Sequence, residues 1–398
     1  MQLVAYGAQD IYLTGNPQIT FFKVVYRRHT NFSMEAILQT FNGTVATGGS
    51  NVTSTISRNG DLVSKLWLEV DLTVAAATGA SYSALTNNTG HAFVKECEIE
   101  IGGQRIDRHY SQWLDIWNEL TDHDEQEWVG LNKHGGKDAY LKRTTLGTDV
   151  HRLYVPLQFW FCRNPGLALP LIALQYHEVK LKLTTRNALA LVNTDGTAVS
   201  PTAVTCNLWA DYIYLDTDER RRFAQVSHEY LIEQLQQDTG AMTASKKLNF
   251  NHPVKELIWV NKDSVAKSQG TTSITTNTAG AVLASGTTTY QLKLNGHDRF
   301  AARDFRYFTR TQVWEHHSGA GGLDSGTAAG AGKFDDSIGV YSFALKPEEH
   351  QPSGTCNFSR IDNAQLVSTT NTLADTIFAV NYNVLRIMSG MGGLAYSN

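Results

Sequence analysis

A series of short segments in which apolar and polar residues alternate is the strongest constraint on how this chain folds. In Cys97–Ile101 every second residue is apolar, and Val179–Leu183 alternates in the same way. Gly102-Gly103 follows the first segment, and Asn295-Gly296 follows the similar Leu292–Leu294. A period of two buries one face of a strand and leaves the other in water, and the glycine pairs signal tight turns. The chain is therefore predicted to be an all-β protein.

The same series of segments occurs twice, once in each half of the chain. A tryptophan-bearing strand, an alternating strand, an aromatic run and a turn containing proline and glycine follow one another in the same order in both halves. Such a repeat predicts two tandem β-domains of about 190 residues, and sandwiches or jelly rolls fit this length better than one large barrel. Five marker pairs, 185 to 198 residues apart, carry the repeat: Met34 with Ile232, Leu68 with Val260, Ile99 with Leu292, Tyr154 with Tyr341, and Leu181 with Leu366.

The joint between the two domains is expected at the charge run Asp216–Arg222, which follows a strand-like segment. Segment Ser227–Gln236, directly after it, fits a helix or a strand, and the repeat favours a strand. The predicted divisions are an N-terminal arm at 1–22, a first jelly roll at 23–215, a linker at 216–226 and a second jelly roll at 227–398.

Long inserts fall at matching places in both halves, and all except the first late insert are interpreted as surface loops. They cover residues 74–92 and 261–289 early in each half, and 107–150 and 301–338 late. The first late insert also contains a short predicted helix, because its apolar residues recur at spacings of three and four. These residues are Tyr110, Trp113, Leu114, Trp117 and Leu120.

The charge balance argues against direct binding of nucleic acid. Lys and Arg number 34 against 38 Asp and Glu, for a net charge of −4, whereas phosphate contacts require a strongly basic surface. The four cysteines form no CxxC pair, so buried reduced thiols are expected rather than a disulfide framework. No signal peptide is expected at the start, and the longest apolar stretch, Leu167–Leu174, is too short to span a bilayer.

Searches for catalytic and metal-binding motifs all fail. His177-Glu178 and His228-Glu229 begin like the zinc motif HExxH, but neither has the second histidine. The adjacent His316-His317 is interpreted as part of a loop, since neighbouring side chains on a strand diverge. Gly326–Lys333 resembles a phosphate loop but lacks its first glycine and its final hydroxyl residue. The chain is predicted not to be an enzyme, with no metal and no cofactor.

Several distinctive blocks span both halves of the chain. The opening block reads GAQDIYLTGNPQITFFKVVYRRHTNF and the tail reads NYNVLRIMSGMGGLAYSN. The blocks are Gly7–Phe32, Pro165–Leu181, Asp211–Gln234, Ser353–Ala364 and Asn381–Asn398. They resemble the major capsid proteins of nucleocytoplasmic large DNA viruses, most strongly those of the phycodnaviruses and chloroviruses in particular, and long identical runs of this kind are highly specific.

This resemblance implies a double jelly roll, that is, two tandem eight-stranded antiparallel β-barrels or sandwiches. It implies a homotrimer that forms a pseudo-hexagonal capsomer, and an icosahedral shell of such capsomers over an internal membrane. Neighbouring capsomers and minor capsid proteins would be its partners, with contact to the membrane or its proteins. The protein would reside in the outer shell of the virion, after assembly in the host cytoplasm.

The resemblance also suggests roles for particular residues. The arm 1–22 would belong to the inward-facing base of the capsomer, although it equally fits a segment packed within its own domain. Lys23, Arg27 and Arg28 would lie near that base and contact anionic lipid or an acidic minor protein; a solvated rim is the simpler interpretation.

Glycans form a second group of expectations. Chlorovirus coat proteins carry atypical glycans near Asn-Thr in exposed loops, which points to Asn277 and Asn371. Asn87 and Asn88 are further candidates, and each site alternatively forms an unmodified turn.

Two other roles fit the same virus. The chain is alternatively a capsid-like paralogue that forms a minor capsomer, or a carbohydrate-binding attachment module. Exposed aromatic residues in the loops would favour the module, and Trp128 and Trp314 are the candidates.

Overall fold

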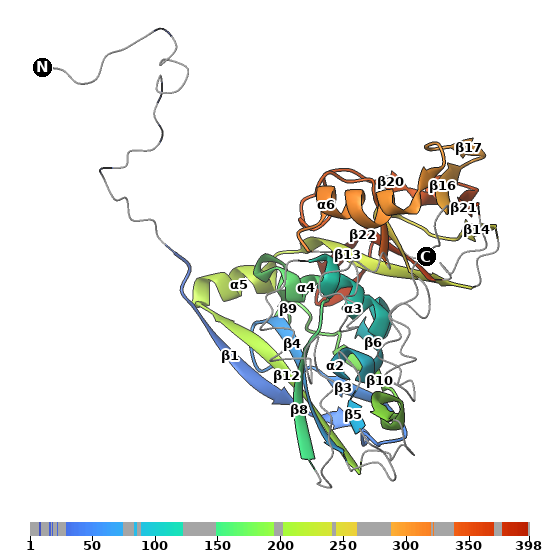
Figure 1. Cartoon of the computed structure of the whole chain (residues 1–398). Helices are drawn as coiled ribbons and strands as arrows, with labels where there is room; N and C mark the ends of the chain where they lie inside the picture. Colours follow the sequence, from blue (N-terminus) through green and yellow to red (C-terminus); the bar gives the residue numbers. More distant parts are fainter. Residues whose placement is uncertain are drawn as a thin grey trace, which may run out of the picture.

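The computed structural model describes residues 29–74, 83–85, 89–121, 149–194, 202–240, 244–260, 288–319, 338–369 and 376–396, together with single residues 8, 16, 18, 22 and 321. Within these residues the first half of the chain folds into two antiparallel sheets packed face to face (Figure 1). One sheet has the order β1 (Phe32–Gln39), β12 (Ala203–Leu215), β4 (Leu62–Val74), β8 (Asp149–Pro156). The other has the order β2 (Phe41–Asn42), β3 (Asn51–Thr55), β10 (Val179–Thr185), β6 (Val94–Ile101), β7 (Gln104–Tyr110).

The second half repeats this arrangement. Its first sheet has the order β13 (His228–Thr239), β22 (Thr376–Met388), β15 (Pro253–Val260), β19 (Ile338–Ser342). Its second sheet has the order β14 (Ser245–Leu248), β21 (Ala364–Ser368), β16 (Thr289–Leu294), β17 (His297–Asp298), and β18 (Arg303–Asp304) also pairs with β16.

Both halves are jelly rolls with the same topology. We number only the strands given above, counting the short β2 with β3 and β18 with β17. The strand order in each half is then first, eighth, third, sixth in one sheet and second, seventh, fourth, fifth in the other. Two four-stranded antiparallel sheets in this order define the jelly roll. The predicted double jelly roll is confirmed.

Short elements complete the described chain. The strands β5 (Ser83–Leu85) and β11 (Val192–Thr194) pair with each other, β9 (Leu169–Pro170) pairs with β4, β20 (Cys356–Asn357) pairs with β15, and β23 (Met391–Leu394) pairs with β22. The α-helices are α2 (Thr89–Phe93), α3 (Ser111–Leu120), α4 (Trp160–Arg163), α5 (Thr217–Gln225) and α6 (Gln312–His316). A π-helical turn, Tyr307–Thr311, precedes α6, and 3-10 turns occupy Pro165–Leu167, Ala188–Leu191 and Phe358–Arg360.

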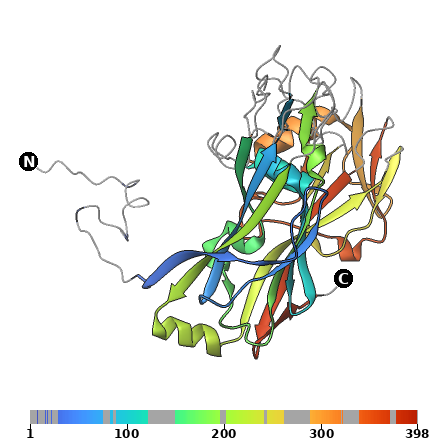
Figure 2. The same ribbon diagram turned by 90° about the horizontal axis from the view of Figure 1, so that it is seen from below.

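The segment between the two jelly rolls forms helix α5. Asp216 caps its start by accepting a hydrogen bond from the Thr217 amide, and acidic residues in its first turn suit the helix dipole. No residue of α5 is buried, so the charged residues of the run DTDERRR keep contact with water when the run forms a helix. Figure 2 shows α5 at one end of the molecule, while α6 lies toward the other. The ambiguous segment after it is strand β13, as the repeat predicted.

Individual marker pairs of the repeat are less accurate than its overall order. Leu68 faces the core of the first jelly roll, whereas Val260 lies on the opposite face of its sheet, under helix α3. Pairing these two residues was therefore wrong by one position. Because a shift of one residue turns a strand's side chains to the other face, the sequence repeat reports strand order better than register.

Candidate functional site: the junction of the two jelly rolls

The seven residues predicted as glycan or base-contact sites lie outside the described residues. They are Asn87, Asn88, Asn277 and Asn371 for glycans, and Lys23, Arg27 and Arg28 for the base. Of the two candidate loop aromatics, Trp128 also lies outside, whereas Trp314 in α6 has 82% of its surface exposed. Within the described ranges, no group of three or more potential ligands is placed to hold a metal ion, and no helix is long and apolar enough to cross a membrane.

The cysteines have no disulfide partners. All four are free thiols; Cys97 is buried and the other three are half-buried. The prediction of buried thiols is therefore confirmed for Cys97 alone. Removal from water raises the pKa of Cys162 and of Cys206 to about 12. Thiols that resist ionisation are poor nucleophiles, which suits a structural role.

Helix α3 joins the two jelly rolls. Leu114 belongs to the core of the first roll, and the neighbouring Asp115 contacts His91 of α2, with Oδ1 and Nδ1 2.6 Å apart. The opposite face of α3 lies on the outer surface of the second roll's sheet, where the Trp113 and Phe378 ring centroids are 5.6 Å apart. That face carries Trp113, Ile116, Trp117 and Leu120, and it packs against Ile258, Val260, Ile338, Val340, Phe378 and Val380.

The helix itself was predictable, and its partner was not. Spacings of three and four place apolar residues on more than one side of α3, which is the sequence signal for a helix buried on two faces. Which face meets the other domain depends on how the rolls pack, and that is visible in Figure 1 as α3 lying between them.

A buried ionic bridge crosses the same junction. Arg163 of α4 places Nη1 2.9 Å from Glu233 Oε2, and its guanidinium carbon lies 4.1 Å from the centroid of the Trp117 ring. The other oxygen of Glu233 lies 2.8 Å from Nζ of Lys255, whose side chain is fully buried. Among the described residues, Nζ of Lys255 has no hydrogen-bond partner with suitable angles. Its buried charge is therefore stabilised mainly by electrostatic attraction to Glu233.

Sequence reasoning missed this bridge. The available signal was two adjacent charged residues, Lys255 and Glu256, inside the otherwise apolar strand Pro253–Val260. A β-bulge between Val254 and Glu256 interrupts the alternation of faces at Lys255, and each of the two buried charges needs a partner of opposite charge.

The partner of Glu256 is His317. Nε2 of His317 lies 2.9 Å from Glu256 Oε2, and its Nδ1 lies 3.0 Å from Glu348 Oε1. Burial alone would lower the pKa of His317, but attraction to both carboxylates and hydrogen bonds with them raise it to about 9. Burial would raise the pKa values of Glu256 and Glu348, but attraction to His317 and hydrogen bonding with it lower the pKa of Glu256. Hydrogen bonds from His317 and from the amide and hydroxyl of Ser318 lower the pKa of Glu348. His316 bonds instead with the Leu345 carbonyl, so the two adjacent side chains diverge. The interpretation of the pair as part of a loop was wrong, because His316 is the last residue of α6.

We expect stability to fall as pH rises, because the folded chain holds the His317 proton more tightly than the unfolded chain does. The stabilisation is complete below the ordinary value of 6.5 and is lost as pH rises through the folded value of about 9. The loss should be about 3 kcal/mol. Urea unfolding from pH 6 to pH 10 should show this slope in the wild type and not in His317→Gln. The control His297→Gln, at an exposed residue, should retain the wild-type profile, and parallel profiles for all three chains would contradict the assignment.

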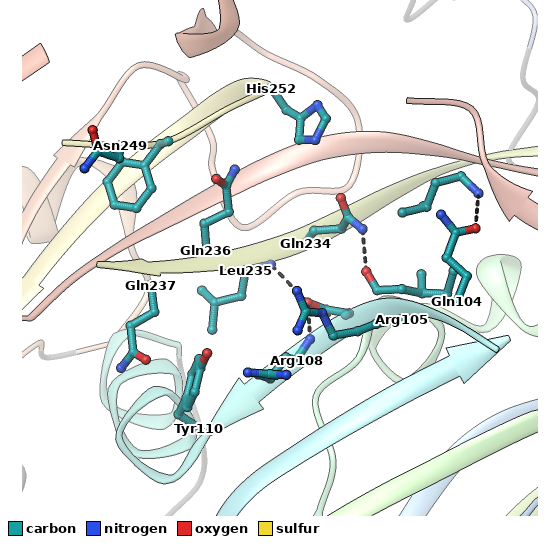
Figure 3. Close-up of a pocket in the computed structure, with 14 residues that line it drawn as sticks. Gln104, Arg105, Arg108, Tyr110, Gln234, Leu235, Gln236, Gln237, Asn249 and His252 are labelled. Atoms are coloured by element: carbon teal, nitrogen blue, oxygen red, sulfur yellow. Dashed lines mark hydrogen bonds between the residues drawn. The ribbon is translucent and has the colours of Figure 1, made fainter. Parts of the chain in front are cut away.

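A cleft of about 430 Å³ lies between the two rolls (Figure 3). It runs between β7 and β13, which are edge strands of their sheets, and mostly polar side chains line it. The Gln234 side chain donates to the Ile106 carbonyl, and the Leu235 amide donates to Asp107 Oδ1 at 3.1 Å. These bonds tie one roll to the other. Among the described residues that line the cleft, no nucleophile lies beside a base. The cleft is part of the contact between the two rolls.

Comparison with known proteins agrees with this architecture. Family models described as "Major capsid protein N-terminus" and "Large eukaryotic DNA virus major capsid protein" match residues 20–216 and 219–393. A major capsid protein of Pyramimonas orientalis virus is 54% identical over 100% of this chain and 99% of its own. The chain belongs to the family of large eukaryotic DNA virus major capsid proteins. The major capsid protein of Paramecium bursaria Chlorella virus 1 is 43% identical, again over 100% of this chain and 99% of its own.

Solved structures of capsid proteins share the fold. A chain of the quasi-atomic PBCV-1 virus capsid model superposes with a TM-score of 0.76 at 38% identity, covering 95% of this chain and 100% of that one. The Faustovirus major capsid protein gives a TM-score of 0.69 at 13% identity, over 96% of this chain and 95% of its own, which shows the fold alone. The chain is thus a structural capsid protein and not an enzyme, and it resides in the virion shell.

Proposed function

We propose that three copies of this chain form a pseudo-hexagonal capsomer and that such capsomers tile the icosahedral outer shell of a large double-stranded DNA virus. The observation that carries this is the shared strand order of the two rolls. Three chains with two similar blocks each present six blocks around a threefold axis, and this outline suits hexagonal packing.

Light scattering coupled to size-exclusion chromatography tests the trimer. The expected mass is about three times the 44.0 kDa of one chain, maintained on dilution. A monomer across the concentration range would refute the proposal. If that monomer bound sugar, it would support the attachment module, which the exposed Trp314 favours. Quantifying the chain in purified virions separates the abundant coat protein from a minor capsomer.

The division of the chain is proposed along the same lines. Residues 1–22 form an arm at the capsomer base, 23–215 and 227–398 form the rolls, and 216–226 link them. Lys23, Arg27 and Arg28 contact anionic lipid or acidic minor capsid proteins at the base, during assembly in the host cytoplasm. Reversing these three charges should abolish co-sedimentation of the trimer with anionic vesicles, and unchanged co-sedimentation would contradict the assignment.

Glycosylation is proposed at the outer loops. Asn277 or Asn371 carries the glycan, with Asn87 and Asn88 as further sites. Peptide mass spectrometry of virion-derived protein should find added hexose mass on peptides containing these residues. If peptides covering Asn277 and Asn371 are both unmodified, the assignment of these two sites is wrong.

A further inference from the structure

The two jelly rolls differ in what covers the outer face of their first sheets. In the second roll, α3 covers this face with a cluster of apolar contacts centred on Trp113 and Phe378. The corresponding face of the first roll belongs to the sheet β1-β12-β4-β8. There Leu38 pairs with Trp209, and Trp209 pairs with Trp67, so the three side chains form one row across three strands.

This row is only partly covered in the described part of the chain. Leu38, on the edge strand β1, is 46% exposed, and Phe32 and Met34 further along the same strand are 57% and 53% exposed. Trp67 and Trp209 are half-buried and belong to none of the buried apolar clusters of the described residues. Partly exposed apolar surface of this kind marks an interaction site.

The second roll carries a counterpart of α3. Both α3 and the helical segment Tyr307–His316 follow the fifth strand of their rolls. Leu114 and Phe308 each pack into the core of their own roll, and they lie 194 residues apart (308 minus 114). At the same offset of 194 residues, Leu120 corresponds to Trp314. Leu120 contacts the second roll, whereas Trp314 is 82% exposed.

A partly exposed apolar face and an exposed tryptophan therefore occupy positions that correspond to a contact inside the chain. We propose that α6 of one copy packs Trp314 onto the row Leu38–Trp209–Trp67 of the next copy, as α3 packs on the second roll within one copy. The contact is heterologous, and three of them close a ring. This inference rests on the proposed trimer and names the surfaces that form it.

Substitution of Trp314 tests the contact. Trp314→Glu should weaken each contact by at least about thirtyfold, because a central tryptophan is a typical hot spot and a carboxylate in its place would be buried without a partner. Light scattering over a dilution series should find a trimer for the wild type and monomers for Trp314→Glu. The matched control Met388→Glu changes another exposed apolar residue, on β22, and should stay trimeric.

Cross-linking provides a second measurement that does not depend on weakening the assembly. A chain carrying both Ala36→Cys and Glu315→Cys, at exposed neighbours that leave Leu38 and Trp314 in place, should give covalent trimers with a short bismaleimide. Wild type and each single-cysteine chain, which share the four native thiols, should give none. A trimer that is insensitive to Trp314→Glu and does not cross-link would overturn this inference but leave the proposed function standing, whereas a monomeric wild type would overturn both.

Discussion

Replacing Trp113 with alanine should lower the free energy of unfolding by about 3–5 kcal/mol, the usual cost of emptying a large buried aromatic site. The Trp113 side chain is fully buried. Its ring centroid lies 5.6 Å from those of both Trp117 and Phe378, so the substitution opens a cavity between the two rolls. Because the site is enclosed by a helix and a sheet, the surroundings can collapse only partly.

Equilibrium unfolding in urea, followed by circular dichroism, measures this loss. The control Leu345→Ala removes an apolar side chain that is 75% exposed and should change stability by no more than about 0.5 kcal/mol. A loss below about 1 kcal/mol for Trp113→Ala would mean that α3 does not hold the rolls together. We also expect the transition to separate into two steps, since α3 provides much of the apolar contact between the rolls.

Removing the carboxylate of Glu233 should cost a similar amount, about 3–5 kcal/mol. Glu233→Ala leaves the fully buried Lys255 ammonium without its partner 2.8 Å away and takes the counter-ion from Arg163. The penalty comes from the stranded charge rather than from the pair itself. The double variant Glu233→Leu, Lys255→Met should therefore recover at least half of the loss, because it removes both buried charges.

The same strand offers a matched control for this cycle. Glu229 also lies on β13 and pairs with Arg386 at 2.7 Å, but both side chains are more than half exposed. Glu229→Ala should change the free energy of unfolding by less than about 1 kcal/mol. Equal losses for Glu229→Ala and Glu233→Ala, or a double variant no more stable than Glu233→Ala, would show that burial of Lys255 does not set the cost.

Much of the fold followed from local pattern. The alternation in Cys97–Ile101 and Val179–Leu183 identified strands β6 and β10, and the spacing of Trp113, Leu114 and Trp117 identified α3. These features were predictable because the spacing of apolar residues along the sequence follows the period of the strand or helix. The linker 216–226 shows the limit: its charges identified an exposed segment, whereas the structure shows that most of it forms the capped helix α5.

The functional surfaces followed from the sequence only in part. Trp314 was a candidate for an exposed aromatic residue in a loop; it is exposed but lies in helix α6, and nothing local relates it to Leu38 or Trp209. Lys255 and Glu256 interrupt an apolar strand, yet their partners Glu233 and His317 lie 22 and 61 residues away. Such pairs form only after sheets and inserts have packed, so no window of sequence contains them.

By itself the sequence determined that this chain is all-β, that it contains one β-domain twice, and that catalytic motifs are missing from it, since each of these is a matter of residue type and spacing. Only the tertiary structure decided that α3 covers the second roll while the matching face of the first stays partly exposed. The reason is physical: period and order are properties of neighbouring residues, whereas the covering of a sheet face depends on where distant segments meet in space.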